Sequence, residues 1–170
     1  NYMQRQRRIK KQSNVKISWI LISIILIIAF TAFIILHTAE RPMTIARGQT
    51  ETIAKKYAGI KDVNSFYTSN LGKTYYSVSG VDNKNKSVYV IVAKKGGTVT
   101  IINSSSGISE QQAKNVVTQR KKPKKINAIG LTLIKSKPYW VVSYMNAKNN
   151  LCFATISFKN GTIYQSIENI

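Results

Sequence analysis

The chain has little of what most enzymes use for chemistry. Its 170 residues contain one cysteine, one histidine and six acidic residues. The single Cys152 excludes an internal disulfide framework and a cysteine-based zinc site, and its place in a β-like run predicts a buried thiol. No histidine follows His37, so the serine run of residues 104–106 has no histidine base; a Ser–Lys pair stays open because lysines are abundant. We therefore expect a non-enzyme with no cofactor and no metal.

Acidic charge is scarce: 26 Lys and Arg residues stand against six Asp and Glu residues, a formal net charge of +20. Such an excess indicates contact with a polyanion, which can be nucleic acid, anionic lipid or an anionic wall polymer. The densest cluster is RKKPKK, which contains Arg120, Lys121, Lys122, Lys124 and Lys125. We identify these five cations as a candidate contact with an anionic surface. The alternative is a solvated helix end that keeps the domain soluble.

Charge is absent from residues 17–36, ISWILISIILIIAFTAFIIL. As a helix, a run of about 20 uncharged residues matches the hydrocarbon thickness of a bilayer. A cleaved signal peptide and a buried soluble helix are the alternatives, but the run is longer than a typical signal-peptide core. Lys and Arg crowd residues 1–16, and such flanks stay in the cytoplasm. We expect a single-pass cell-membrane protein with a cytoplasmic basic tail (1–16), a transmembrane helix (17–36) and an extracytoplasmic remainder.

The remainder of the chain repeats itself. The segment KTYYSVSGVDNKNKSVYVIVAKKGGT (73–98) aligns without a gap on KPYWVVSYMNAKNNLCFATISFKNGT (137–162). Agreement through two successive turns favours a true repeat over two unrelated hairpins. We expect two units, residues 40–103 and 108–170. Each unit alone would bury only a marginal core, so we expect the two to pack together.

Each unit is predicted to be a helix followed by antiparallel strands. The helices are residues 43–58 and 109–120, and Ser109 with Gln112 forms a capping box at the start of the second. Turn residues between β-rich runs indicate hairpins, and the loops are too short for parallel crossovers. The expected strands are 63–70, 74–81, 87–93, 99–103, 127–135, 139–145, 151–158 and 163–167. The fold class is thus α+β, with an N-terminal transmembrane helix followed by two tandem helix-on-antiparallel-sheet units.

Alternation along the second strand of each unit assigns its side chains to two faces. Tyr76 and Trp140 should lie under the helix as equivalent core anchors. Tyr75 and Tyr139 then point to the opposite face, which we identify as a candidate partner face. Aromatic residues beside cations also suit single-stranded nucleic acid. Outside the cell that would require DNA uptake, so nucleic acid is not the expected partner.

The layout resembles a known family. The resemblance rests on RRIKK followed by ISWILISIILIIAF, then on TYYSVSGVDNKNKSVYVIV and its echo PYWVVSYMNAKNNLCFATI. These segments resemble the TseB-like (YpmB) family of Gram-positive cell-wall elongation regulators, whose repeats are PepSY-like units of the cystatin type. The resemblance implies a partner in the same membrane, a penicillin-binding protein that synthesises peptidoglycan. It carries no catalytic motif.

Two further interpretations accompany this resemblance. Contact of the basic residues with anionic lipid or a teichoic-acid-type polymer is inferred from charge and not from the family. The alternative function is a PepSY-type inhibitor or chaperone of an extracellular protease. A binding partner of wall synthesis would distinguish the first function from the second.

Overall fold

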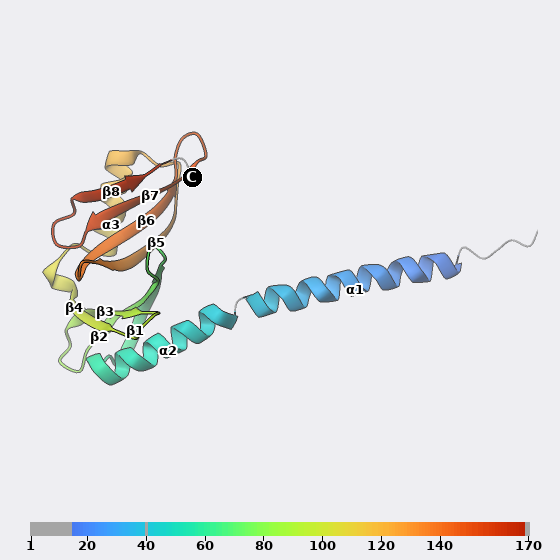
Figure 1. Cartoon of the computed structure of the whole chain (residues 1–170), viewed down its shortest axis with the longest axis horizontal. Helices are drawn as coiled ribbons and strands as arrows, with labels where there is room; N and C mark the ends of the chain where they lie inside the picture. Colours follow the sequence, from blue (N-terminus) through green and yellow to red (C-terminus); the bar gives the residue numbers. More distant parts are fainter. Residues whose placement is uncertain (1–14, 40, 169–170) are drawn as a thin grey trace, which may run out of the picture. The chain divides into compact units, whose positions relative to one another are not determined.

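The structure is a computed structural model that describes residues 15–39 and 41–168, with side chains over residues 19–35 and 42–168 (Figure 1). The chain divides into two compact units, residues 1–43 and 44–170. The first unit contains helix α1 (Val15–Ala39), followed by the start of helix α2 (Arg41–Ala58). Most of the predicted basic tail, residues 1–14, lies outside the described residues.

Helix α1 contains the whole uncharged run of residues 17–36, so this run is helical as predicted, and its crossing of a membrane stays a prediction. Its large apolar side chains between Trp19 and Ile35 are 47% to 67% exposed. A search of the residues that the structure describes finds no helix with the length and apolarity needed to cross a membrane.

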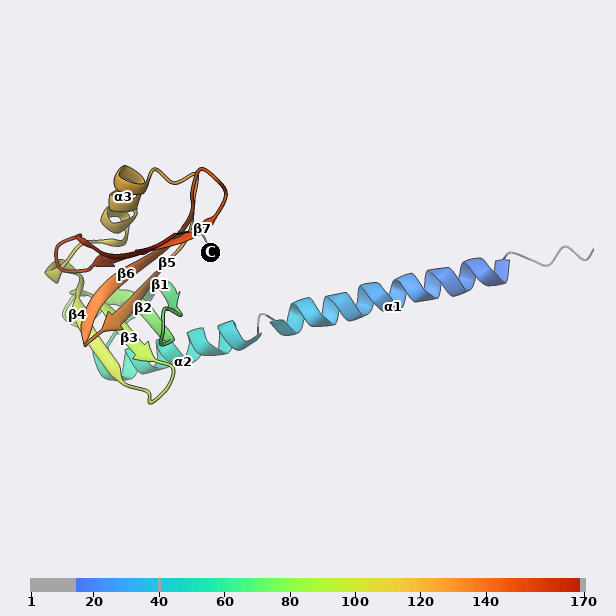
Figure 2. The same cartoon turned by 45° about the horizontal axis from the view of Figure 1, so that its top comes forward.

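The second unit contains two four-stranded antiparallel sheets, and each follows a helix (Figures 1 and 2). Helix α2 precedes the first sheet, which is made of β1 (Asp62–Ser69), β2 (Tyr75–Val81), β3 (Ser87–Ala93) and β4 (Val99–Asn103). A 3₁₀ helix, η1 (Ser104–Ser106), leads to α3 (Glu110–Lys121). The second sheet is made of β5 (Lys125–Ile134), β6 (Lys137–Met145), β7 (Leu151–Ser157) and β8 (Ile163–Ile167). The predicted α+β class with two helix-and-sheet repeats is confirmed.

The repeat extends to turn geometry and strand register. In the β2–β3 turn, Asp82 Oδ1 accepts hydrogen bonds from the backbone N–H groups two and four residues further on. Asn146 makes the same two contacts in the β6–β7 turn. The first strand of each sheet also has a bulge at an asparagine, Asn64 in β1 and Asn127 in β5. A bulge adds local twist, so the two sheets bend at equivalent places.

Helix α2 covers one face of the first sheet. Ala54 in α2 is fully buried, and it belongs to a core cluster with the β2 residue Val78 and three valines of β3. Gly59 follows the helix with φ +61°, the left-handed conformation that favours glycine at a helix end. These apolar contacts form the core of the first repeat.

The opposite face of the first sheet is buried as well. Strand β3, SVYVIVA, is buried along five successive residues, a pattern typical of a strand covered on both faces. Four residues of the first sheet point from this second face into one core cluster: Tyr67, Tyr75, Tyr89 and Ile91. The same cluster contains the residues on the helix-covered face of the second sheet. The two repeats therefore share a core, which we call the joint core.

Trp140 in β6 lies at the centre of the joint core and is fully buried. Its indole Nε1 donates a hydrogen bond of 2.9 Å to the carbonyl oxygen of Ile108, just before α3. Its ring contacts Tyr67 and Tyr89 of the first sheet edge-on, with centroid separations of 5.6 and 5.3 Å. Such T-shaped contacts add about 0.5–1.5 kcal/mol beyond area burial. One side chain of the second repeat thus contacts the first repeat directly.

Backbone contact between β1 and β5 brings the repeats closer still. A Cβ atom at Gly130 in β5 would overlap the carbonyl oxygen of Thr68 in β1, so this approach requires glycine. Nearby, Ser77 Oγ donates a 3.4 Å hydrogen bond to the carbonyl oxygen of Leu131. The junction therefore combines apolar packing with direct contact to the β5 backbone.

Two assignments of side chains to faces need correction. The predicted exposed position of Tyr75 is wrong, because this residue is only 8% exposed and lies in the joint core. The predicted equivalence of Tyr76 and Trp140 is also wrong: Tyr76 is half-buried and stacks on Phe66, with a centroid separation of 6.1 Å. For Tyr75 the reason is that the second repeat covers the sheet face that we expected to be open. Tyr76 lies with Phe66 on the α2-covered face but outside the buried cluster of that face.

Replacing Trp140 with alanine should lower the free energy of unfolding of the full chain by about 3–5 kcal/mol, the usual range for a buried aromatic residue. The matched control is Tyr164→Ala, whose side chain is 54% exposed and whose loss should cost less than about 1 kcal/mol. Urea unfolding followed by circular dichroism measures both. Equal losses in the two variants would contradict the joint core.

Candidate functional site

The five cations of the RKKPKK cluster lie together at the end of α3 and the start of β5: Arg120, Lys121, Lys122, Lys124 and Lys125. Lys122 ends the helix in the left-handed conformation, with φ +46°. Lys121 forms a 2.8 Å ion pair with Glu168, and this hydrogen bond raises the pKa of Lys121. Lys124 Nζ donates to the side chain of Asn149. The cluster is largely exposed, and its contact with an anionic surface stays a prediction.

The second predicted partner residue, Tyr139, lies on the outer face of the second sheet, opposite α3. It is half-buried, and its ring contacts that of Tyr164 with a centroid separation of 5.0 Å. A groove of about 280 Å³ lies between this face and residues 68–71 of the first repeat. Strands β5–β7 form its other side, where Ser143 and Phe153 are among the lining residues. This outer face, with its exposed Tyr164 and its groove, is the surface on which a partner can reach the predicted tyrosine.

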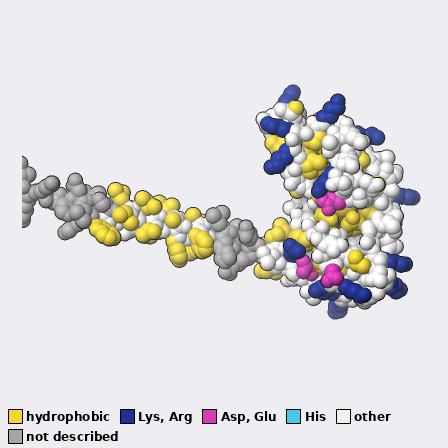
Figure 3. All heavy atoms as spheres, turned by 180° about the vertical axis from the view of Figure 1, so that it is seen from behind, with side chains coloured by type: hydrophobic (Ala, Val, Ile, Leu, Met, Phe, Trp, Pro, Cys, Tyr) yellow, Lys and Arg dark blue, Asp and Glu magenta, His cyan; other side chains and the backbone are white. Residues whose placement is uncertain are grey.

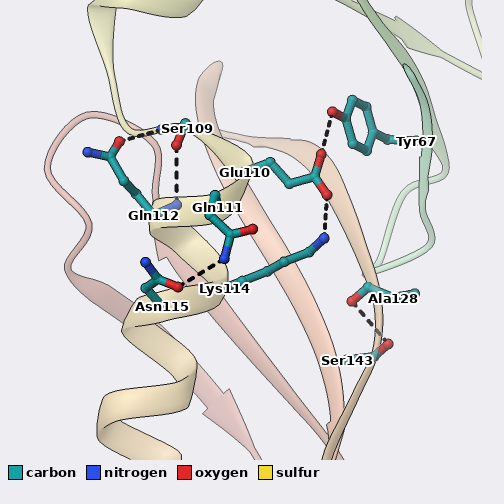
Figure 4. Close-up of polar contacts among 9 residues, drawn as sticks. All are labelled: Tyr67, Ser109, Glu110, Gln111, Gln112, Lys114, Asn115, Ala128 and Ser143. Atoms are coloured by element: carbon teal, nitrogen blue, oxygen red, sulfur yellow. Dashed lines mark hydrogen bonds and ion pairs between the residues drawn. The ribbon is translucent and has the colours of Figure 1, made fainter. Parts of the chain in front are cut away.

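Sequence reasoning missed a polar network that links the two repeats. Tyr67 in β1 donates a 2.7 Å hydrogen bond to Glu110 Oε2 in the first turn of α3 (Figure 4). Glu110 Oε1 accepts from Lys114 Nζ, one helical turn further on. The Glu110–Lys114 spacing of four residues was visible in the sequence, but its partner Tyr67 is 43 residues away from Glu110. Only the packing of the repeats brings the three together.

The environment of this network shifts two pKa values in opposite directions. Burial and the hydrogen bond to Glu110 raise the pKa of Tyr67 to about 12. Burial alone would raise the pKa of Glu110, but the hydrogen bonds from Lys114 and Tyr67 outweigh it and hold that pKa below its usual value. The network is therefore a neutral tyrosine bound to an ionised, paired carboxylate. We interpret it as a structural clamp between the repeats.

The predicted capping box at the start of α3 is confirmed. Ser109 Oγ accepts from the N–H of Gln112 at 3.2 Å, and Gln112 Oε1 accepts from the N–H of Ser109 at 2.8 Å (Figure 4). This reciprocal pair of hydrogen bonds fixes the first turn of α3, from which Glu110 reaches Tyr67. Local sequence chemistry thus positions the clamp.

Side chains of the types that bind metals are not brought together in the described part of the chain. Over those residues, no group of three or more His, Cys, Asp or Glu side chains could hold a metal ion. Cys152 is fully buried, as predicted for a core thiol. The side chain of His37 lies outside the described residues.

Lysine and arginine side chains are spread over the visible face of the second unit, with few acidic side chains among them (Figure 3). Three of the described acids, Glu51, Glu110 and Glu168, are in ion pairs with neighbouring cations. Asp82 accepts hydrogen bonds from its own turn, and these bonds lower its pKa. Most of the cationic charge therefore has no acidic partner within the described residues.

Comparison with known proteins agrees with this architecture. Residues 49–93, from within α2 to the end of β3, match the family described as "Cell wall elongation regulator TseB-like domain". Among solved structures, the chain is similar to the YpmB protein from Bacillus subtilis, with a TM-score of 0.61 and 24% identity. That similarity covers 71% of this chain and 95% of that one. No curated protein matches the chain.

These findings define first a class, proteins with two tandem helix-and-antiparallel-sheet repeats, and the likeness to YpmB shows that this fold is shared. Residues 49–93 of the first repeat are then similar to a TseB-like domain. The resemblance to the TseB-like (YpmB) family is therefore confirmed, and the domain match supports a role in regulating the cell wall.

Replacing Tyr67 with phenylalanine should remove a hydrogen bond to a charged group and lower the free energy of unfolding by about 1–3 kcal/mol near neutral pH. The deficit should shrink between about pH 10 and pH 12. There the unfolded tyrosine ionises while the folded one keeps its proton, so the unmodified chain loses stability that the variant never had.

Urea unfolding of both proteins at a series of pH values measures this difference. Tyr164→Phe is the control, because Tyr164 is exposed and lies outside the joint core. A deficit that stays constant through the alkaline range would show that Tyr67 does not hold its proton in the folded chain.

Proposed function

We propose that this chain is a membrane-anchored, extracytoplasmic regulator of peptidoglycan synthesis that acts by holding a penicillin-binding protein. The observation that carries the proposal is the match of residues 49–93 to a cell-wall elongation regulator domain. That match covers the second half of α2 and three strands of the first sheet, which together build the core of the first repeat.

The proposed anchor is helix α1. Its support comes from the sequence, since residues 17–36 carry no charge, and from the exposure of the described apolar side chains along the helix. Exposed apolar side chains on every side of a helix are costly in water and favourable in a lipid bilayer. The Lys- and Arg-rich flank of residues 1–16 favours a cytoplasmic N-terminus, which would leave residues 44–170 outside.

The proposed mode of action is binding without catalysis. The described carboxylates that have partners are bound to lysine, arginine, hydroxyl or backbone groups, and the clamp of Tyr67, Glu110 and Lys114 lies at the junction of the repeats. A rigid two-repeat body of this kind can present a fixed surface to a partner in the same membrane. We expect little change of shape on binding, as is usual for preorganised interfaces.

The proposed partner face is the outer face of the second sheet. Tyr75 no longer qualifies as a contact because the second repeat buries it. Tyr139 and Tyr164 remain accessible together, and tyrosine is enriched at protein interfaces because it offers a large apolar ring with a polar end. Gln165 in β8 pairs with Thr155 of β7, which places it on this same face.

A cysteine at Gln165 should allow a membrane-impermeant thiol crosslinker, applied to intact cells, to capture a penicillin-binding protein. The native thiol does not interfere, because Cys152 is fully buried. The control is Lys84→Cys in the exposed β2–β3 turn, which should be labelled on intact cells but capture less of that partner. Mass spectrometry identifies the captured protein.

Three results would contradict parts of this proposal. Labelling of both cysteines only after cell lysis would refute the extracytoplasmic location. Capture of a secreted protease from Gln165→Cys would favour the inhibitor or chaperone function. Equal capture of a penicillin-binding protein from both positions would refute the assignment of the partner face.

A further inference from the structure

Three hairpin turns from both repeats surround a groove that lies apart from the RKKPKK cluster and from the outer face of the second sheet. The β1–β2 and β3–β4 turns of the first repeat form part of its wall, and the β5–β6 turn of the second repeat forms the rest. Its volume is about 530 Å³, and a second hollow of about 600 Å³ adjoins it over Lys73, Lys94 and Lys95. We call this site the turn groove.

Each turn contributes a lysine to the rim of the turn groove: Lys73, Lys95 and Lys135. All three are exposed, as is the neighbouring Lys94. The lining also contains Leu133 and Ile134 beside the buried Tyr75, while Thr98, Thr100 and Ser136 add hydroxyl groups. The turn groove thus combines three cations with a mixed lining of apolar and hydroxyl-bearing side chains.

Within the described part of the chain, no ion pair involves the three rim lysines. The residues that line the turn groove include no Asp or Glu. Among the described residues, the acids found in ion pairs are bound to Arg47, Lys114 and Lys121, which lie outside the groove. Charges of one sign around a concave, low-dielectric surface strengthen the local potential and raise the local concentration of counter-ions. The turn groove is therefore arranged to attract an anion.

The positions of the lysines indicate the form of that anion. They come from three separate turns around one groove, a distribution that suits several charges spaced along a chain. Lysine acts as a compact point charge, whereas arginine provides a planar fork that grips a carboxylate or a phosphate with two hydrogen bonds. The lining contains lysine and no arginine, a set that suits singly charged, spaced phosphodiesters contacted one ammonium group at a time.

We propose that the turn groove binds a linear anionic phosphodiester polymer, with Lys73, Lys95 and Lys135 as its charge contacts. The apolar and hydroxyl-bearing side chains of the lining contact the uncharged segments of the polymer between its phosphates. The joint core is what creates the site, because it brings the β5–β6 turn beside the two turns of the first repeat. This inference extends beyond the proposed regulation of wall synthesis and does not depend on a protein partner.

The test uses the full chain in a neutral detergent with fluorescently labelled poly(glycerol phosphate), and fluorescence anisotropy measures its binding. The variant Lys73→Gln/Lys95→Gln/Lys135→Gln should bind about tenfold more weakly, since three exposed ion pairs are lost. The control Lys84→Gln/Lys148→Gln/Lys159→Gln removes the same charge from exposed turns elsewhere and should bind within about twofold of the unmodified chain. Thermal unfolding checks that all three proteins are equally folded.

Competition separates the remaining possibilities. Unlabelled poly(glycerol phosphate) should displace the probe at lower concentration than poly-aspartate or detergent micelles containing phosphatidylglycerol. Equal weakening in both triple variants would show that net charge alone attracts the polymer and would overturn the site. Stronger competition by poly-aspartate or by the lipid would overturn the phosphodiester polymer as the ligand. A Gln variant of Lys121, Lys122, Lys124 and Lys125 that abolishes binding would move the site to the RKKPKK cluster.

Discussion

The structure of residues 44–168 depends on the burial of the second face of the first sheet against the second repeat. Trp140 is the centre of that contact: its ring contacts two tyrosines of the first sheet, and its indole N–H is bonded at the entry to α3. A repeat of about 60 residues buries little apolar surface by itself. Sharing one core solves this problem for both repeats. It also fixes the clamp between Tyr67 and Glu110, and it brings three hairpin turns together at the turn groove.

Periodicity and turn chemistry predict the elements of this fold from sequence, because these signals are local. The Asx turns at Asp82 and Asn146, the capping box at Ser109 and the alternation in β6 all depend on residues close in the chain. What sequence could not predict was the partner of the first sheet's second face, which depends on contacts between distant residues. Tyr75 was therefore assigned to an open face that is in fact covered. The continuous apolar run of β3 was the one local indication of burial on both sides.

The same limit explains why the candidate sites changed. RKKPKK was predicted as a contact for an anionic surface because its five cations are adjacent in the sequence. The lysines of the turn groove are up to 62 residues apart, from Lys73 to Lys135, and only the packing of the repeats makes them neighbours. The proposed function, regulation by binding, needs surfaces of fixed geometry. The joint core supplies two, the outer face of the second sheet and the turn groove.

The central claim is that the two repeats unfold as one cooperative unit because they share a core. Native-state hydrogen exchange of the full chain tests this directly, by comparing the most protected amides of β2 and β3 with those of β6 and β7. The account predicts the same free energy of opening and the same denaturant dependence for both sets. A first sheet that opens at a markedly lower free energy, with the second sheet still protected, would contradict it.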